Sequence, residues 1–123
     1  MKKILVVEDD PVNLQILTDY LGANGYAMRG AVNGVDGIAA FHREQPDLML
    51  IDVQLPRKSG FEVCFELKRP GGARAVPVIL MSAILASKGD QRYAAEGVHA
   101  DAFLSKPFSM GQMLERIQEL LPA

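Results

Sequence analysis

The sequence predicts an α/β fold in which a doubly wound, parallel sheet of five strands is covered by helices on both faces. Three observations support this fold. Short apolar runs alternate with longer segments of helical periodicity along the whole chain. The two strongest runs, Ile4–Val7 and Leu48–Ile51, have no polar alternation, which is typical of strands buried on both faces of a parallel sheet. The length of 123 residues suits one compact domain, so residues 1–123 are expected to form a single unit.

The segment up to residue 31 is predicted to form a strand, a helix and a second strand. Lys3–Val7 is the first strand. Asp10 and Pro11 begin the first helix as its N-cap and its first helical residue, and Asn24-Gly25 ends it. Tyr26–Ala31 is a weaker strand near an edge of the sheet, because its arginine and glycine fit poorly in a buried centre.

A second helix, a third strand and a third helix are predicted next. Asn33-Gly34 is a turn, and residues 34–45 follow as a helix. Leu48–Asp52 is the third strand. Ser59 is the N-cap of the third helix, and the glutamate three residues later completes a capping box.

The last part of the chain is predicted to contain two strands and two helices. Val76–Met81 is the fourth strand, with a proline near its start, where a missing N–H costs least. Residues 87–96 form a fourth helix of low apolar content, and Ala102–Leu104 is a short fifth strand. Ser109 is the N-cap of the final helix.

The composition argues against several classes of protein. With a net charge of −2 the chain shows no basic patch for nucleic acid, and no apolar stretch is long enough to span a membrane. The single cysteine, Cys64, cannot form an internal disulfide and fits its predicted helix as a small core residue. A reducing compartment is consistent with this cysteine content, so a cytoplasmic location is expected.

Polar residues follow the apolar strands at the points where these strands end. They are Glu8, Asp9, Asp52, Ser82 and Lys106. The carboxyl ends of parallel strands meet at one edge of the sheet, where doubly wound folds bind their ligands. Carboxylates brought together there need neutralising, and Mg²⁺ is a hard cation that binds carboxylate oxygens, water and phosphate. A carboxylate nucleophile, a metal, an ammonium group and a hydroxyl donor together indicate a phosphoryl-transfer site.

Four motifs occur at the ends of these strands. In chain order they are Val7-Glu8-Asp9-Asp10, Asp52 with Leu55-Pro56 and Gly60 downstream, Ser82-Ala83, and Lys106-Pro107-Phe108. In these motifs the chain resembles, over its whole length, the receiver domain of two-component response regulators. The resemblance implies a flavodoxin-like fold with five helices and the strand order 2-1-3-4-5.

The resemblance also implies a role for each site residue. Asp52 would be the phosphoacceptor, and Ser82 and Lys106 would contact the phosphoryl oxygens. The implied ligands of Mg²⁺, with Mn²⁺ as an alternative, are Glu8 through water, Asp9, Asp52 and the backbone carbonyl of Gln54. Phe103 occupies the position of the family's switch aromatic, usually a tyrosine, although core packing would explain it equally well.

The partners implied by the resemblance are a sensor histidine kinase or a histidine phosphotransfer protein, and a downstream protein or output domain. The chain would be a phosphorylation-controlled signalling module rather than a turnover enzyme, and the face formed by helix four, strand five and helix five would change on phosphorylation. In the family the first helix docks on the kinase. Val12, Ile16 and Tyr20 lie off the predicted core face of that helix and are a candidate partner surface. The kinase, the downstream partner and any further domain stay open.

Two other functions use similar folds. A phosphatase of the haloacid-dehalogenase kind needs a second aspartate two residues after its nucleophile, where this chain has Gln54, which cannot act as a general acid. A flavodoxin-like cofactor domain needs a loop rich in Gly, Ser or Thr after its first strand, and the acids at 8–10 would repel phosphate there. A receiver that no longer accepts phosphate would lack a site residue, whereas all five positions carry competent side chains.

Overall fold

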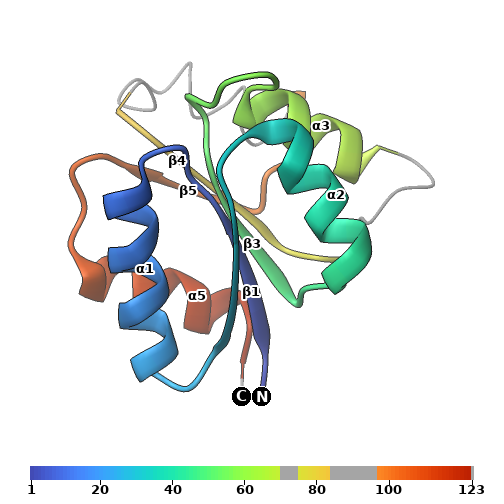
Figure 1. Cartoon of the computed structure of the whole chain (residues 1–123). Coiled ribbons are helices and arrows are strands. Elements are labelled where there is room, and N and C mark those ends of the chain that lie inside the picture. The colour runs from blue at the N-terminus through green and yellow to red at the C-terminus, as the bar shows by residue number, and fades with distance from the viewer. Residues whose placement is uncertain (70–74, 84–96, 123) are drawn as a thin grey trace.

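The structure of the chain is a computed structural model that describes residues 1–69, 75–83 and 97–122. Its centre is a parallel sheet of five strands in the order β2-β1-β3-β4-β5 (Figure 1). The strands are β1 (Lys3–Val7), β2 (Ala27–Ala31), β3 (Leu48–Asp52), β4 (Val78–Ser82) and β5 (Ala102–Ser105). The doubly wound, flavodoxin-like order that the resemblance implied is therefore confirmed.

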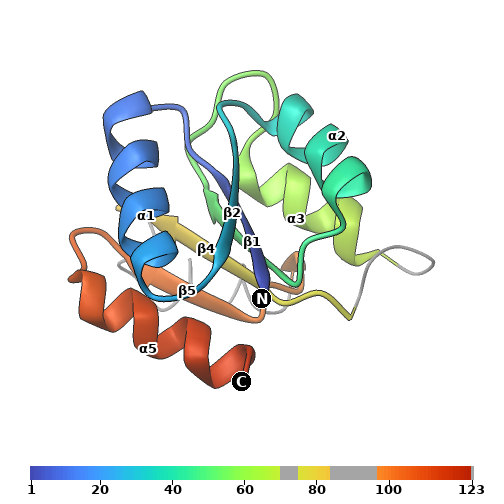
Figure 2. The same ribbon diagram turned by 60° about the horizontal axis from the view of Figure 1, so that its bottom comes forward.

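Helices cover both faces of the sheet. Those in the described residues are α1 (Pro11–Ala23), α2 (Gly34–Glu44), α3 (Gly60–Lys68) and α5 (Met110–Leu120). The pair α1 and α5 lies on one face, and α2 and α3 lie on the other (Figure 1 and Figure 2). The predicted fourth helix, residues 87–96, falls outside the described residues. In the part of the chain that is described, no helix has both the length and the apolar character needed to cross a membrane.

The apolar core forms two layers, one on each face of the sheet. Along β1, Leu5 and Val7 belong to the layer under α2 and α3, whereas Ile4 and Val6 belong to the layer under α1 and α5. This alternation is the period of two that a strand imposes. β3 is buried over its whole length, which confirms that its apolar run is a central strand. The sheet is thus held from both faces, and its carboxyl edge is left to polar residues.

The helix caps predicted from the sequence are present. Asp10 accepts a hydrogen bond from the N–H of Val12 at 2.9 Å and so caps α1. Ser59 and Ser109 each form a complete capping box with the side chain three positions later, at the starts of α3 and α5. These caps satisfy N–H groups that a helix start leaves without partners, which fixes where each helix begins.

The predicted ends of three strands are wrong by one or two residues. β2 begins at Ala27 rather than Tyr26. β4 begins at Val78 rather than Val76, because Pro77 has no N–H to offer a ladder. β4 and β5 each extend one residue further than predicted, since Ser82 pairs with Ser105 in register. The predictions left the polar residues Ser82 and Ser105 out of these two strands, but backbone pairing does not depend on their side chains.

Asn33 and Tyr20 also differ from the predictions. Asn33, predicted to lie in a turn, is the N-cap of α2, and its side chain accepts a hydrogen bond from the N–H of Asp36 at 2.8 Å. Tyr20, predicted to be exposed, is half-buried and packs on the core layer under α1 and α5. Val12 and Ile16 are exposed as expected, at 65% and 49%.

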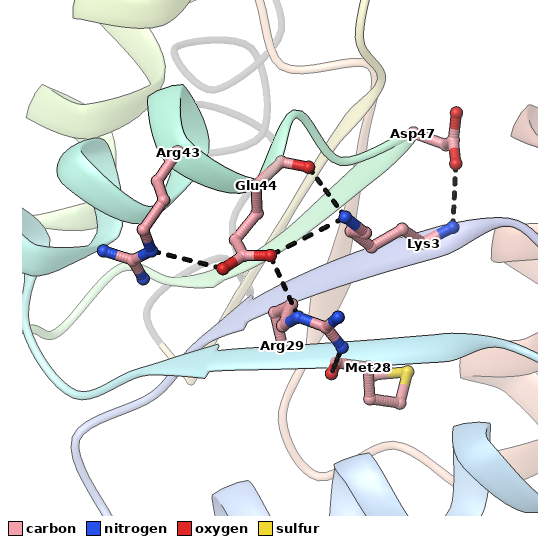
Figure 3. Close-up of polar contacts among 6 residues, drawn as sticks. All are labelled: Lys3, Met28, Arg29, Arg43, Glu44 and Asp47. Atoms are coloured by element: carbon pink, nitrogen blue, oxygen red, sulfur yellow. Dashed lines mark hydrogen bonds and ion pairs between the residues drawn. The ribbon is translucent and has the colours of Figure 1, made fainter.

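A charged group ties the end of α2 to the sheet at the edge where β1 begins (Figure 3). The carboxylate of Glu44 pairs with Arg29 at 3.0 Å, with Arg43 at 3.2 Å and with Lys3 at 3.6 Å. The Lys3 ammonium also donates to the backbone carbonyl of Glu44 at 2.9 Å. Arg43 and Arg29 together hold the pKa of the Glu44 carboxyl below its usual value. One glutamate therefore joins α2 to both β1 and β2.

A second polar group, in which Lys68 and Cys64 are buried and Asp101 is exposed, joins the end of α3 to the segment before β5. The ammonium of Lys68, which is 3% exposed, lies 2.7 Å from Oδ2 of Asp101. The thiol of Cys64 is fully buried, as predicted, and donates to the carbonyl of Val98 at 3.3 Å. Burial raises the pKa of this thiol to about 12, and the charge of Asp101 adds to the increase while that of Lys68 opposes it.

Candidate functional site

The structure gathers the predicted site residues at the carboxyl edge of the sheet. Glu8 directly follows β1, Asp52 is the last residue of β3, and Ser82 is the last residue of β4. Lys106 directly follows β5. The strand order reverses between β1 and β3, which is the position where doubly wound sheets bind their ligands. Glu8 and Asp52 therefore flank the switch point of the fold.

Three carboxylates form an acidic cluster at this position. One oxygen from each of Glu8, Asp9 and Asp52 lies within 4.8 Å of the other two. Glu8 is 2% exposed and Asp52 is 4% exposed, whereas Asp9 faces solvent. Burial of two carboxylates this close together is unfavourable unless positive charge is nearby.

Lys106 supplies the positive charge. Its ammonium nitrogen lies 2.7 Å from Oδ2 of Asp52 and 3.8 Å from Oε1 of Glu8. Its backbone N–H donates to the carbonyl of Ser82 at 3.1 Å, and the peptide bond to Pro107 is cis. The turn after β5 is therefore attached to the end of β4, with the lysine side chain directed across the edge of the sheet to β3.

The loop after β3 holds the other oxygen of Asp52. The backbone N–H of Gln54 donates to Oδ1 of Asp52 at 2.9 Å, and its side chain is exposed. Gly60, the first residue of α3, donates its N–H to the carbonyl of Val53 at 2.9 Å. A Cβ on Gly60 would collide with the carbonyl oxygen of Asp52, so only glycine allows α3 to start this close to the acidic cluster.

The surroundings of the cluster affect the ionisation of Glu8 and of Lys106. Burial, followed by the neighbouring Asp52 carboxylate, raises the pKa of Glu8 to about 7, while the charge of Lys106 and the side chain of Asn13 oppose the increase. Burial alone would lower the pKa of the Lys106 ammonium, but the carboxylates of Asp52, Glu8 and Asp9 outweigh burial and raise it. The charged form of Glu8 is therefore poorly compensated by its surroundings, and a further cation beside it would favour that form.

The donor set fits a hard divalent cation. Oε2 of Glu8 is buried and has no hydrogen-bond partner in the described structure, so a polar atom is available beside two other carboxylates. Mg²⁺ prefers oxygen ligands of this kind and keeps several waters, which suits a cluster with one exposed member. Among the residues that the structure describes, no cysteine or histidine accompanies the three acids, and this argues against the softer transition metals.

Ser82 and Phe103 occupy the remaining predicted positions. Ser82 is completely buried at the end of β4. Phe103 is half-buried on β5 and packs on the core layer under α2 and α3. Its ring therefore contributes to the core, and a switch role for it stays a prediction.

The sequence reasoning missed Asn13 and the pocket beside it. A pocket of about 360 Å³ lies next to the acidic cluster, between α1 and the turn after β5. Its lining includes Glu8, Asn13, Ile16, Phe108 and Met110. Its position could have been inferred from the sequence, because Asn13 follows the N-cap Asp10 by three residues. This spacing places its amide in the first turn of α1, next to the acids at 8–10.

A family model described as the response regulator receiver domain matches residues 4–118. The chain belongs to this family. Receiver domains are signalling modules of two-component systems rather than turnover enzymes, and they interact with histidine kinases or phosphotransfer proteins and with downstream targets. The predicted family and the predicted class of function are therefore confirmed at this level.

Three relatives show how closely the receiver fold is shared. Over 120 residues the chain is 36% identical to the polar-differentiation response regulator DivK of Brucella anthropi, covering 98% of this chain and 96% of DivK. It is 31% identical, with a TM-score of 0.88, to the signal receiver domain of a histidine kinase from Syntrophus aciditrophicus, covering 98% and 90% of the two chains. It is 25% identical, with a TM-score of 0.86, to the receiver domain of the sensor kinase PA1611 from Pseudomonas aeruginosa, covering 99% and 98%. That last structure carries a magnesium ion coordinated in its active-site cleft.

Proposed function

We propose that this receiver domain, formed by residues 1–123, accepts a phosphoryl group on Asp52 and changes its contacts with a partner in response. The observation that carries the proposal is the position of Asp52. Its carboxylate lies in a cluster with Glu8 and Asp9, and it is held from both sides by Lys106 and by the N–H of Gln54. This arrangement supplies a nucleophilic oxygen, acids for a cation and an ammonium group at one point.

The proposed reaction is phosphoryl transfer from a phosphohistidine. An oxygen of Asp52 forms a bond to phosphorus while the bond from phosphorus to the donor nitrogen breaks. The imidazole keeps the electron pair and takes up a proton from solvent. Lys106 and Ser82 contact the transferred oxygens as charge develops on them. Attack of water on the phosphorus atom later returns Asp52 to its free form and releases inorganic phosphate.

The cluster would hold the cation that such a transfer needs. The proposed ligands are Glu8 through water, Asp9, Asp52 and the backbone carbonyl of Gln54. When bound, Mg²⁺, or Mn²⁺ in its place, neutralises the phosphoryl oxygens and the three acids at once. Oε2 of Glu8, which is buried and has no hydrogen-bond partner among the described residues, supports this assignment. Without a cation, the Glu8 carboxylate is attracted by the ammonium of Lys106 and repelled by the carboxylate of Asp52.

The output of phosphorylation is proposed to pass through β5. Lys106 and Ser82 would contact the phosphoryl group from the neighbouring carboxyl ends of β5 and β4, where the N–H of Lys106 donates to the carbonyl of Ser82. Phe103 lies on the same strand, three residues before Lys106. Movement of Ser82 toward the phosphate would let this ring move inward. The face that includes β5 and α5 would then change its contacts with a downstream protein.

The proposed phosphodonor is a histidine kinase or a phosphotransfer protein that docks on α1. Val12 and Ile16 are exposed apolar residues on this helix, and Ile16 also lines the pocket beside Glu8. Val12→Asp or Ile16→Asp is expected to slow transfer from the protein donor tenfold or more but to leave transfer from a small phosphodonor unchanged. Equal rates from the protein donor would remove α1 from the docking surface. The cytoplasmic location expected from the sequence stays a prediction.

The proposal is tested by intact mass. The protein is incubated with Mg²⁺ and a small acyl phosphate and is expected to gain one phosphoryl group that mild alkali removes. Asp52→Asn should gain none. Asp19→Asn, which changes an exposed aspartate of α1, is the matched control and should behave as the parent protein does. If the parent protein gains no mass in the presence of Mg²⁺, the proposal is wrong. If Asp52→Asn gains the same mass as the parent protein, the phosphoacceptor is a residue other than Asp52.

A further inference from the structure

The loop between β3 and α3 sets the position of the Gln54 backbone, and this backbone contacts Asp52. The N–H of Gln54 donates to Oδ1 of Asp52 at 2.9 Å, and its carbonyl is one of the proposed metal ligands. Contacts that fix residues 53–59 therefore also fix the N–H and the carbonyl of Gln54 relative to Asp52. The bonds within the loop are short-range, such as that from the N–H of Leu55 to the carbonyl of Val53 at 3.1 Å.

The middle of this loop is strained. Arg57 has a φ of 71°, in the left-handed region that side chains other than glycine rarely adopt. The N–H of Lys58 donates to the carbonyl of Pro56 at 2.8 Å, which closes a three-residue turn around Arg57. A γ-turn with positive φ at its centre is rare, and such a conformation persists only where the surrounding structure imposes it. The loop therefore needs a support outside itself.

The start of α2 provides that support. The N–H of Gly34 donates to the carbonyl of Pro56 at 3.3 Å, so this carbonyl accepts from both α2 and its own turn. The guanidinium of Arg57 lies 3.9 Å from Oδ1 of Asp36 on the first turn of α2. A Cβ on Gly34 would collide with the carbonyl oxygen and the Cβ of Lys58. The loop that leads into α3 runs beside the first turn of α2 in both views of the fold (Figure 1 and Figure 2).

The start of α2 is itself firmly anchored. Asn33 is 8% exposed, and its side chain both accepts from the N–H of Asp36 at 2.8 Å and donates to the Asp36 carboxylate at 2.9 Å. Gly37, one turn into the helix, is close enough to β1 that an added Cβ would lie 3.0 Å from a methyl group of Val7. The first turn of α2 is therefore a fixed surface against which a strained loop can rest.

We propose that Gly34 is a positioning residue for the acidic site. Its lack of a side chain and its N–H allow α2 to brace the β3–α3 loop, and the brace sets where the backbone of Gln54 lies relative to Asp52. The inference rests on the proposed function for the identity of the bound cation. The contact between Gly34 and the loop does not depend on phosphoryl transfer.

The test compares Gly34→Ala with two controls in the folded protein. Gly22→Ala makes the same change on exposed α1, where an added Cβ meets only an ordinary contact at 3.8 Å with Met28. Leu21→Ala destabilises the core at the far end of α1 without contacting the loop. In metal-free protein, the amide resonance of Gln54 is expected to shift in Gly34→Ala alone. Its Mg²⁺ affinity is expected to fall about tenfold, the scale of lost support behind a metal ligand, while both controls stay within twofold.

Failure of this inference and failure of the proposed function give different results. A folded Gly34→Ala variant whose Gln54 resonance and Mg²⁺ affinity match the parent protein overturns the brace, even if Asp52 is phosphorylated. A parent protein that takes no phosphate on Asp52 overturns the proposed function, even if the Gln54 resonance shifts.

A measurement on the parent protein covers the case in which Gly34→Ala does not fold. Coupling between two sites is reciprocal, so if the brace supports Mg²⁺ binding, then Mg²⁺ must support the brace. Saturating Mg²⁺ is expected to slow hydrogen exchange of the Gly34 amide more than that of the amides within α5. Equal changes at both places would show that α2 does not brace the site.

Discussion

At the scale of single residues, charge is unevenly distributed around Asp52. Both of its oxygens have a donor, Lys106 on one side and the N–H of Gln54 on the other. Glu8, buried to the same degree, has the Lys106 ammonium 3.8 Å from one oxygen, and its other oxygen has no hydrogen-bond partner in the described structure. Among the described residues of the metal-free protein, one ammonium thus pairs with two buried carboxylates. Stability of this state should depend strongly on that lysine.

Lys106→Met is expected to destabilise the metal-free protein. Loss of one partner from a buried charge pair leaves the other charge uncompensated, but Lys106 is partly exposed and water screens some of that cost. We expect a loss of about 1–3 kcal/mol in the free energy of unfolding. Urea unfolding in the presence of a chelator measures it, with exposed Lys2→Met as the control, expected to change stability by less than about 0.5 kcal/mol.

Mg²⁺ should restore part of the stability that Lys106→Met loses, because a cation at the acidic cluster replaces the missing positive charge. The increase in unfolding free energy on adding Mg²⁺ is therefore expected to be larger in the variant than in the parent protein. An equal increase would show that Lys106 and the cation act independently.

At the scale of elements, α2 is fixed at both ends. Its first turn supports the β3–α3 loop through Gly34, and its last residue, Glu44, is tied to β1 and β2 through Lys3 and Arg29 (Figure 3). The two ends lie at opposite edges of the sheet, so the helix connects the polar site to a charged group far from it. Changes at the Glu44 end can therefore be used to measure how strongly the helix is held.

Glu44→Gln is expected to destabilise the protein slightly at neutral pH and not at all in acid. The pKa of this carboxyl is lowered in the folded state, by Arg43 first and then by Arg29. A lowered pKa means that its contribution to stability is complete above the ordinary value and is lost as the pH falls through the folded-state value. Urea unfolding of parent and variant near pH 7 and near pH 3 measures the difference, which should vanish at the lower pH. A difference that persists there would assign the role of Glu44 to packing instead.

Two glycines at helix starts should respond oppositely to alanine. In Gly60→Ala the new methyl group would collide with the backbone of Asp52 and Val53, and overpacking of this kind costs about 1–3 kcal/mol. Gly111→Ala on exposed α5 meets only Ser109 Oγ at 3.8 Å and should gain up to about 1 kcal/mol from helix propensity. Thermal unfolding of both variants tests this, and a neutral Gly60→Ala would show that α3 can shift without cost.

Much of the architecture could be predicted because its signals are local. An apolar run that ends in Asp52, or a serine three residues before a glutamate, is visible within one segment. The predicted ends of β4 failed because Val76 looks like a strand residue and Ser82 looks like a loop residue, while the ladder is set by backbone partners on other strands. The position of polar residues at one edge followed from the topology of parallel strands.

Contacts between distant segments could not be predicted. The pair of buried Lys68 with exposed Asp101 and the contact of Gly34 with Pro56 join residues that no periodicity links. A lysine at the end of a helix is ordinarily exposed to solvent, so nothing in the sequence indicates that Lys68 is buried. The lack of a hydrogen-bond partner for Oε2 of Glu8 among the described residues is likewise a property of the folded site, because it depends on the position of the Lys106 ammonium.

At the scale of the whole molecule, the apolar layers hold the sheet while the site at its carboxyl edge is electrostatically incomplete. Any cation that binds the folded state there must therefore stabilise the whole domain. This coupling can be measured without any phosphodonor or partner.

Mg²⁺ is expected to raise the free energy of unfolding by about 2.7 kcal/mol at a concentration one hundred times its dissociation constant. Asp9→Asn should lose most of this increase, because it removes one acid of the cluster. Asp10→Asn is the matched control. Asparagine caps a helix as well as aspartate does, so α1 should keep its start and the Mg²⁺ effect should be retained. Full retention of the effect in Asp9→Asn would place the cation elsewhere.

The burial of Cys64 has a practical consequence. A thiol reacts with alkylating reagents as the thiolate, and a thiol with a pKa of about 12 that is fully covered offers almost none while the domain is folded. The chain has no second cysteine to obscure the reading. Alkylation of Cys64 is therefore expected to require a local opening of the domain around α3, and its rate would measure how often such openings occur in unmodified protein. The rate at which the protein gains the mass of the alkylating group therefore reports local opening of the domain.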